Sequence, residues 1–159
     1  MARLRRYSTT PIIALLLVLS GCSTVLAPVR KASHLSGQIT LDVTIDPAAN
    51  NNAALAVDLV TVSDKKVLTE VSAFPSATWF AKRKDYVRLH SKQMHVYSWE
   101  WVPGQQVVSM KIPQTALADG ILLFANYAAP GAHSVVLPKS GVVRIDLGPE
   151  DLQLLSPAK

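Results

Sequence analysis

Apolar and polar residues alternate along residues 37–46, and this is the clearest pattern in the chain. Ile39, Leu41, Val43 and Ile45 share one face of the segment, and polar residues occupy the other face. A period of two residues is typical of a strand with one buried face. Residues 54–62 are more apolar and predict a central strand. Further strands are predicted at 93–102, 105–112, 121–127, 133–137 and 142–147.

Turn-forming residues separate these segments. Pro47 and a run of three asparagines end the first predicted strand and predict a loop over residues 47–53. Pro103 and Gly104 suit a type II turn, because proline fixes φ and glycine supplies a positive φ. About seven short strands with this punctuation predict a mainly β fold, a β-sandwich.

Residues 64–92 depart from this pattern and predict a short helical insertion. Asp64 is expected to cap a first helix and Ser76 a second, because short polar side chains accept main-chain N–H bonds at helix starts. Pro75 separates the two helices. The expected buried positions are Val67, Leu68, Val71, Trp79, Phe80 and Val87. The opposite, solvent-exposed side is expected to hold Lys82, Arg83 and Lys84.

The first 22 residues follow the pattern of a secretion signal. Three arginines precede an eight-residue apolar run at 12–19, which is too short to span a bilayer that needs about 20 apolar residues. Leu19-Ser20-Gly21-Cys22 follows and resembles the lipobox of bacterial lipoproteins. That resemblance implies cleavage before Cys22 and a covalent lipid on its thiol. The alternatives are a short uncleaved anchor and an ordinary secretory signal.

The predicted organisation is a signal peptide at 1–21, a lipidated cysteine and tether at 22–36, and a β-sandwich domain at 37–155. Several acyl chains on Cys22 would hold the protein firmly on a membrane. By analogy with bacterial lipoprotein sorting, Ser23 favours the outer membrane. The chain has one cysteine, so the domain is expected to fold without disulfides.

The net charge of the chain adds little to the predicted fold and organisation. Cleavage removes the three leader arginines and lowers the side-chain balance from +5 to +2, with 13 basic residues against 11 acidic residues. No nucleic-acid partner is therefore expected.

The chain offers no recognisable catalytic or metal site. His34, His90, His95 and His133 have no spacing typical of metal ligands, and solvated or hydrogen-bonded histidines are expected. Motifs for a nucleophile elbow, a zinc protease or a phosphate loop do not occur. We therefore expect a protein that is not an enzyme, with no cofactor apart from the lipid on Cys22.

Two further groups of residues each allow two interpretations. His95, Tyr97, Trp99 and Trp101 alternate along one strand face; a core position is favoured, and an exposed partner-binding patch is the alternative. Ser98 and Glu100 suggest that the opposite face is wet. The cluster of Lys82, Arg83, Lys84 and Arg88 is expected to be a solvated helix face, and the alternative is docking to an acidic protein or to anionic headgroups.

The order of these features resembles the TssJ family of type VI secretion lipoproteins. The resemblance covers most of residues 37–150: the amphipathic first strand, the polar loop, the helical insertion with Trp79-Phe80, the Pro103-Gly104 turn and the strand that ends in Phe124-Ala125-Asn126-Tyr127. It implies a transthyretin-like β-sandwich held on the periplasmic side of the outer membrane. It also implies that a loop between early strands binds the periplasmic domain of an inner-membrane partner, TssM.

Carried over by position, the partner-binding loop is 47–53, and its candidate contact residues are Pro47, Asn50, Asn51 and Asn52. A plain turn is the alternative interpretation of this loop. The expected function is to anchor an envelope-spanning secretion complex. Two other functions stay open: a pilotin or other envelope-assembly lipoprotein, and an envelope enzyme that acts on peptidoglycan or lipid.

Overall fold

The computed structural model describes residues 37–113 and 115–155 of the 159-residue chain. The expected signal peptide, Cys22, the tether and His34 lie outside the described residues. These features therefore remain predictions.

The first sheet contains both of the terminal strands of the domain. Its order is β4 (Met110–Ile112), β1 (Ile39–Ile45), β7 (Gly141–Leu147) and β8 (Leu152–Leu155). β1 runs parallel to β7, with Ile39 opposite Gly141 and Ile45 opposite Leu147. The other two pairings in this sheet are antiparallel.

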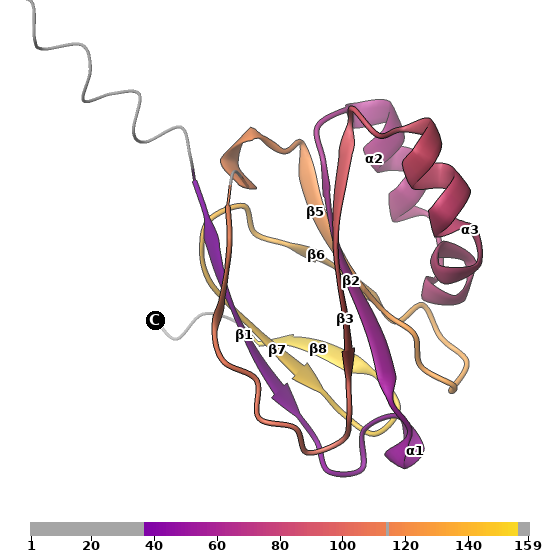
Figure 1. Ribbon diagram of the computed structural model, residues 1–159, viewed down its shortest axis with the longest axis vertical. Coiled ribbons are helices and arrows are strands. Elements are labelled where there is room, and N and C mark those ends of the chain that lie inside the picture. Colours follow the sequence, from indigo (N-terminus) through magenta and orange to yellow (C-terminus); the bar gives the residue numbers. More distant parts are fainter. Residues whose placement is uncertain (1–36, 114, 156–159) are drawn as a thin grey trace, which may run out of the picture. The chain divides into compact units, whose positions relative to one another are not determined.

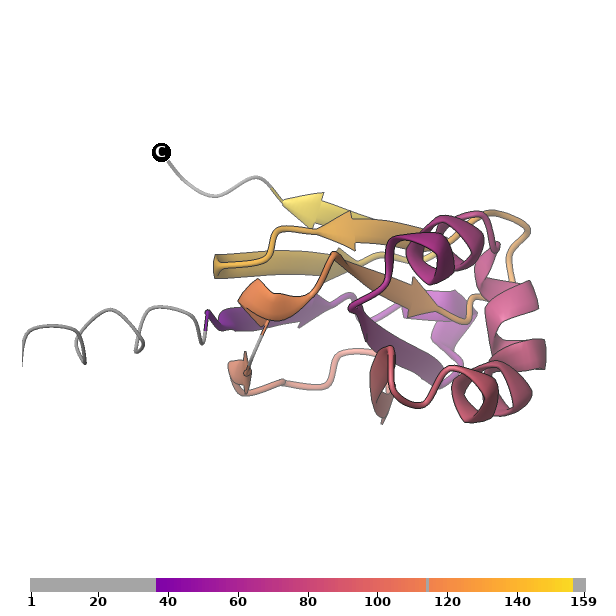
Figure 2. The same ribbon diagram turned by 90° about the horizontal axis from the view of Figure 1, so that it is seen from above.

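The second sheet is antiparallel throughout. Its order is β3 (Met94–Trp101), β2 (Leu55–Val62), β5 (Gly120–Ala125) and β6 (Ser134–Leu137). The two sheets lie face to face, as Figures 1 and 2 show. The predicted β-sandwich is therefore confirmed, and residues 37–113 and 115–155 contain eight strands rather than about seven.

The strands alternate as the sequence predicts, and their inward-facing residues form the main core. Ile39, Leu41 and Ile45 of β1 are buried there against Val57 and Leu59 of β2. The expectation that residues 54–62 form a central strand is confirmed, because β2 pairs with β3 on one side and β5 on the other. At about 25 cal/mol per Å² of apolar surface, burial of this kind is the main stabilising contribution.

The predicted helical insertion is also confirmed. α2 (Lys65–Ser72) and α3 (Ser76–Leu89) cover the outer face of the second sheet (Figure 1). The Asp64 side chain caps α2 and accepts hydrogen bonds from the main-chain N–H groups of Lys66 and Val67. A second apolar cluster fills the space between helices and sheet: Val60, Val62, Val67, Val71, Trp79, Met94, Leu122 and Phe124.

The prediction for Arg83 is correct only in part. Its side chain is 41% exposed, but its guanidinium turns towards the sheet and donates to both carboxylate oxygens of Asp58 at 2.9 and 2.8 Å. Asp58 is fully buried in β2, and it also accepts a 2.9 Å hydrogen bond from Trp79 Nε1. A buried carboxylate needs such partners, and α3 supplies both of them. Lys82 and Lys84 are exposed, as expected.

Two local predictions also need correction. Ser76 does not cap α3: Pro75 precedes the helix, and Ser76 is its first residue, with a buried hydroxyl that has no hydrogen-bond partner among the described residues. The strand predicted at 105–112 is limited to Met110–Ile112, and β8 was not predicted. β8 was missed because it has only four residues, and the adjacent Leu154 and Leu155 break the alternation of apolar and polar positions.

The aromatic residues of β3 lie on the inner face, as favoured. Trp101 is buried, and Tyr97 and Trp99 are half-buried against the main core. Their rings form a ladder, with centroids 6.3 Å apart for Tyr97 and Trp99 and 5.5 Å apart for Trp99 and Trp101. His95 continues this ladder but is exposed, so the core position favoured for His95 is wrong. On the opposite face, Ser98 and Glu100 are exposed, as expected.

Candidate partner-binding site

The loop between β1 and β2 lies at one end of the sandwich and contains the short helical turn α1 (Ala49–Asn52) (Figure 1). We call residues 46–54 the β1–β2 loop, and this end of the domain the loop end. The strands that meet there are fixed by register, because Ile45 lies opposite Leu147 and Leu55 lies opposite Trp101. Three other connections therefore surround the loop: those that follow β3, β5 and β7.

Three successive asparagines give this loop an uncommon backbone. Asn50, Asn51 and Asn52 have φ values of 48°, 53° and 62°, all in the left-handed region. Asparagine is several-fold enriched in that region, whereas most other side chains meet a steric penalty there. The sequence run therefore matches a specific backbone shape rather than a generic polar turn.

The buried side chain of Asn50 holds the loop in place through hydrogen bonds. Its side chain is only 5% exposed, and its amide group bonds at both ends. The Nδ2 group donates to the Ala54 carbonyl at 3.0 Å, and Oδ1 accepts from the Ala128 main-chain N–H at 2.8 Å. Asn50 thus links the β1–β2 loop to the connection after β5, and its buried side chain is poorly placed for contact with a partner.

The base of the loop is held equally firmly. The Asp46 side chain accepts from the Ala48 N–H at 2.6 Å, and its carbonyl accepts from the N–H groups of Ala49 and Gly104. Gly104 has a φ of +71°, and Gln105 N–H donates to the Val102 carbonyl at 3.1 Å. The predicted turn at Pro103-Gly104 is therefore confirmed, and it braces the loop.

The exposed part of the loop is small, neutral and polar. Pro47, Asn51 and Asn52 are exposed, together with the small residues around them. Each asparagine amide offers two donors and an acceptor. Because the backbone is already fixed, a partner that binds here does not have to order the loop. The structure separates the three asparagines into one anchor and two exposed side chains, which the sequence pattern alone did not distinguish.

The loop end around Asn51 and Asn52 is acidic. The loop end contains five acidic residues and, in segments 46–54, 99–107, 126–133 and 146–151, no lysine or arginine. The acidic residues are Asp46, Glu100, Asp146, Glu150 and Asp151. A surface of this charge favours a basic partner surface and repels an acidic one.

His133 is a structural residue of the same end. Its ring is 6% exposed, with Nδ1 2.9 Å from Asp151 Oδ1 and Nε2 2.7 Å from the Ala129 carbonyl. The Tyr127 ring packs 4.9 Å from the imidazole, and its hydroxyl donates to the Gly148 carbonyl. Burial, with the charges of Asp151 and Asp146 nearby, raises the pKa of Tyr127 above its ordinary value. His133 is thus hydrogen-bonded, as expected, and it fixes the neighbouring loop.

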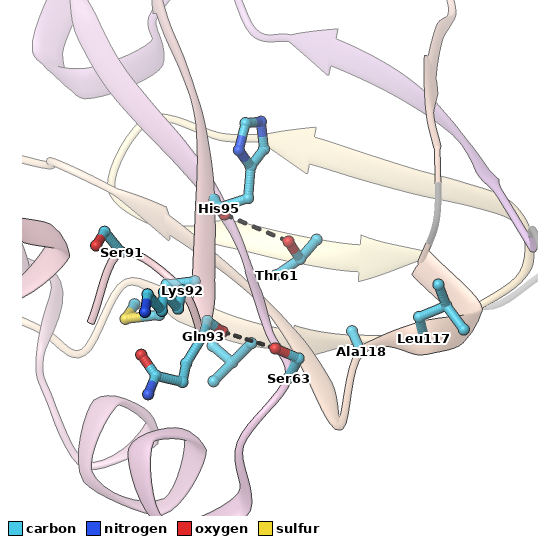
Figure 3. Close-up of a pocket in the computed structure, with 10 residues that line it drawn as sticks. Thr61, Ser63, Ser91, Lys92, Gln93, His95, Leu117 and Ala118 are labelled. Carbon is cyan, nitrogen blue, oxygen red and sulfur yellow. Dashed lines mark hydrogen bonds between the residues drawn. The ribbon is translucent and has the colours of Figure 1, made fainter.

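A pocket of about 430 Å³ lies at the opposite end of the second sheet, and the sequence pattern did not predict it. Thr61, Ser63, Lys92, His95 and Leu117 contribute to its lining (Figure 3). The two hydroxyl groups bond to the carbonyls of His95 and Gln93, rather than to a side-chain base. Among the described residues, no group of three or more His, Cys, Asp or Glu side chains is arranged to hold a metal ion.

Comparison with solved structures identifies the fold. Lip of Serratia marcescens, a membrane-bound component of the type VI secretion system, matches with a TM-score of 0.55 at 14% identity, over 78% of this chain and 98% of that chain. The type VI lipoprotein TssJ1 of Pseudomonas aeruginosa matches with a TM-score of 0.55 at 15% identity, over 78% and 99% of the two chains. A chain of a type VI membrane complex matches with a TM-score of 0.58 at 18% identity, over 75% and 98%.

The domain has a TssJ-like fold. The resemblance seen in the order of sequence features is therefore confirmed at the level of the fold. No protein-family model and no curated protein matches the sequence. In the described part of the chain, none of the helices is long and apolar enough to cross a membrane.

Proposed function

We propose that this protein is an outer-membrane lipoprotein that anchors an envelope-spanning type VI secretion complex. In this proposal, lipid on Cys22 holds the domain to the membrane, and the β1–β2 loop binds the periplasmic domain of a TssM-like inner-membrane protein. The role is mechanical, with no reaction and no cofactor. The observation that carries the proposal is the hydrogen-bonded, exposed loop with Asn51 and Asn52 at its tip.

The geometry of β1 supports this division of roles. The chain enters the described domain at Gly37, next to the start of β1, and the β1–β2 loop follows the end of the same strand. Seven strand residues span roughly 23 Å at about 3.3 Å per residue. A lipid attached upstream of β1 and a partner bound at the loop would therefore act on opposite ends of one strand. Force between them would pass along β1, which pairs on both sides with other strands.

The comparisons support the same setting. The matched structures include two type VI lipoproteins and a chain of a type VI membrane complex. The acidic loop end adds one detail to the proposal. We expect the partner surface to be basic, so that its association with the loop weakens as salt concentration rises.

The loop is tested with Asn51→Gly/Asn52→Gly. Glycine keeps the left-handed backbone and removes only the two amides. We expect at least about a tenfold lower recovery of a large inner-membrane protein in a crosslinked pull-down from native envelopes, because side chains at the centre of an interface dominate its affinity. Asn126→Gly removes an exposed amide at the same end but outside the loop, and it should leave recovery unchanged. Equal recovery with both variants would contradict the assignment of the loop.

The anchor is tested separately with Cys22→Ala. This variant should lose acylation, measured by mass spectrometry, and should no longer support secretion. Normal secretion by an unacylated protein would contradict mechanical anchoring. Recovery of an outer-membrane pore alone in the pull-down would instead favour a pilotin.

A further inference from the structure

The end of the domain opposite the β1–β2 loop differs from it in charge. We call this the tether end, because Gly37 lies there: its carbonyl accepts from the Thr115 main-chain N–H at 2.9 Å. In segments 62–66, 90–94, 110–120 and 137–141, which meet at this end, five exposed lysines stand against two carboxylates, Asp64 and Asp119. The lysines are Lys65, Lys66, Lys92, Lys111 and Lys139.

Hydrogen bonds and strand register place the segments that carry these lysines at one end of the domain. Lys111 is adjacent to Ile112, which lies opposite Ile39 at the start of β1. The Lys139 carbonyl accepts a hydrogen bond from Thr115 Oγ1 at 2.7 Å. The Lys139 ammonium group donates a hydrogen bond to the Ala118 carbonyl at 3.2 Å. Ala118 and Leu117 line the same pocket as Lys92 (Figure 3).

The pocket also connects this surface to the first turn of α2. It is lined by Ser63, which bonds through its main-chain N–H to the Gln93 carbonyl. Lys65 and Lys66 follow Ser63 by two and three residues. The five lysines therefore come from four different segments of the chain but lie at one end.

Exposed apolar side chains accompany the lysines. Leu117 is 60% exposed on the short helix η2 (Thr115–Leu117), and Val142 is 44% exposed near the start of β7. Large apolar side chains among lysines are typical of surfaces that rest in the headgroup region, where the apolar group inserts and the ammonium groups meet phosphates. The loop end offers the opposite charge and would be repelled by the same surface.

We infer that the tether end docks on an anionic phospholipid surface, with Leu117 in the headgroup layer. The occupant follows from two observations: the charge of this end, and the position of Gly37, which leaves 14 residues between it and Cys22. Docking would orient the domain so that the β1–β2 loop points away from the membrane. This inference rests on the proposed lipid anchor, and it adds a second, reversible contact to it.

The test uses the lipidated protein, purified from membranes and reconstituted in phosphatidylcholine vesicles with and without phosphatidylglycerol. Leu117→Cys places a fluorophore at the tether end, because Cys22 is the only cysteine of the chain and has no free thiol when lipidated. Asn52→Cys places the same fluorophore at the loop end as a control. Nitroxide on the lipid headgroups quenches a fluorophore that lies in the headgroup layer.

We expect strong quenching of the residue 117 fluorophore in anionic vesicles only, reversed by high salt, and no quenching at residue 52. Lys92→Gln/Lys111→Gln should lower the ratio of docked to undocked domains by about 25-fold, because each lysine near an anionic surface contributes about a fivefold gain. The matched control Lys82→Gln/Lys84→Gln removes two exposed charges from α3 and should leave quenching unchanged.

The outcomes separate the two proposals. Vesicle flotation reports the anchor, and a protein that does not float would overturn the lipid on Cys22. A floating protein would overturn the docking inference if residue 117 were quenched no more than residue 52, or equally with neutral lipid. An equal loss of quenching with the two double-lysine variants would also overturn it, because the charge of the tether end would then have no specific role.

Discussion

The inner and outer faces of the second sheet are both buried, but different interactions hold them. On the inner face, β2 and β5 contribute buried side chains that are all apolar: Leu55, Val57, Leu59, Ile121, Leu123 and Ala125. On the outer face, the helices cover apolar residues and one fully buried carboxylate, Asp58. Trp79 and Arg83 of α3 satisfy this carboxylate, and the Trp79 ring stacks on Phe124 with centroids 5.1 Å apart.

The difference concerns specificity. Apolar contact has no preferred direction, so the inner face depends on filled volume and tolerates small shifts. A buried carboxylate has fixed acceptor positions, so α3 must lie where its indole and guanidinium reach them. The inner face therefore supplies most of the burial, and the outer face sets the position of the helix. Stability should therefore depend on side-chain volume at the inner face and on the partners of Asp58 at the outer face.

The largest effect is expected from Arg83→Ala. The Arg83 side chain is 41% exposed, but the Asp58 carboxylate is fully buried and would lose its cation. Leaving a buried charge uncompensated costs about 3 to 5 kcal/mol. The free energy of unfolding is measured by urea denaturation. Lys84→Ala removes an exposed charge from the adjacent position and should change it by less than about 0.5 kcal/mol. Similar values for the two variants would show that the ion pair does not matter for stability.

On the inner face, Leu59→Ala should lower the free energy of unfolding by about 3 kcal/mol, because it leaves a cavity in the main core. Leu59→Met nearly conserves volume and should cost less than about 1.5 kcal/mol. Urea denaturation of both variants measures whether this face responds to volume. If methionine were as harmful as alanine, the comparison between the two faces would fail.

A smaller effect of opposite sign is expected at Ser76. Its hydroxyl is buried without a partner among the described residues, so Ser76→Ala should stabilise the protein by about 1 kcal/mol. A capping serine would instead lose about 1 kcal/mol on the same substitution. The sign of the change in thermal denaturation therefore distinguishes the structure from the original prediction.

Ser76 and Arg83 show where prediction from sequence ends. Alternation and turn residues were sufficient to predict the sandwich, the central strand and both helices, because these depend on local periodicity. Asp58 stands as a single charge within an apolar segment, which indicates a buried pair. The sequence does not tell which of Lys82, Arg83 and Lys84 is the partner, since that depends on the rotation of α3 against the sheet.

The candidate loop shows the same limit. The asparagine run predicted a loop at the correct place, because asparagine is a turn-forming residue. The left-handed φ values of all three asparagines were not predicted. The burial of Asn50 depends on Ala128, 78 residues away, so it could not be predicted. The tether end was missed for a similar reason: its lysines come from separate segments of the chain, and only the folded arrangement brings these segments together.

The smallest effect is expected at alkaline pH, on the helix side of the sheet. Tyr86 of α3 donates to Glu70 of α2 at 2.6 Å. Burial raises the pKa of Tyr86 to about 12 from 10, and the hydrogen bond and charge of Glu70 add to the shift. The folded state thus favours the neutral phenol, so this contribution to stability is complete below pH 10 and is lost as the pH rises towards 12.

Tyr86→Phe should therefore show a weaker decrease in the free energy of unfolding between pH 10 and pH 12, measured by urea denaturation at each pH. Tyr127 is unchanged in both proteins, so its own ionisation cancels in the difference. Parallel pH profiles would mean that Tyr86 and Glu70 do not interact, and the link between α2 and α3 would then rest on apolar contact alone.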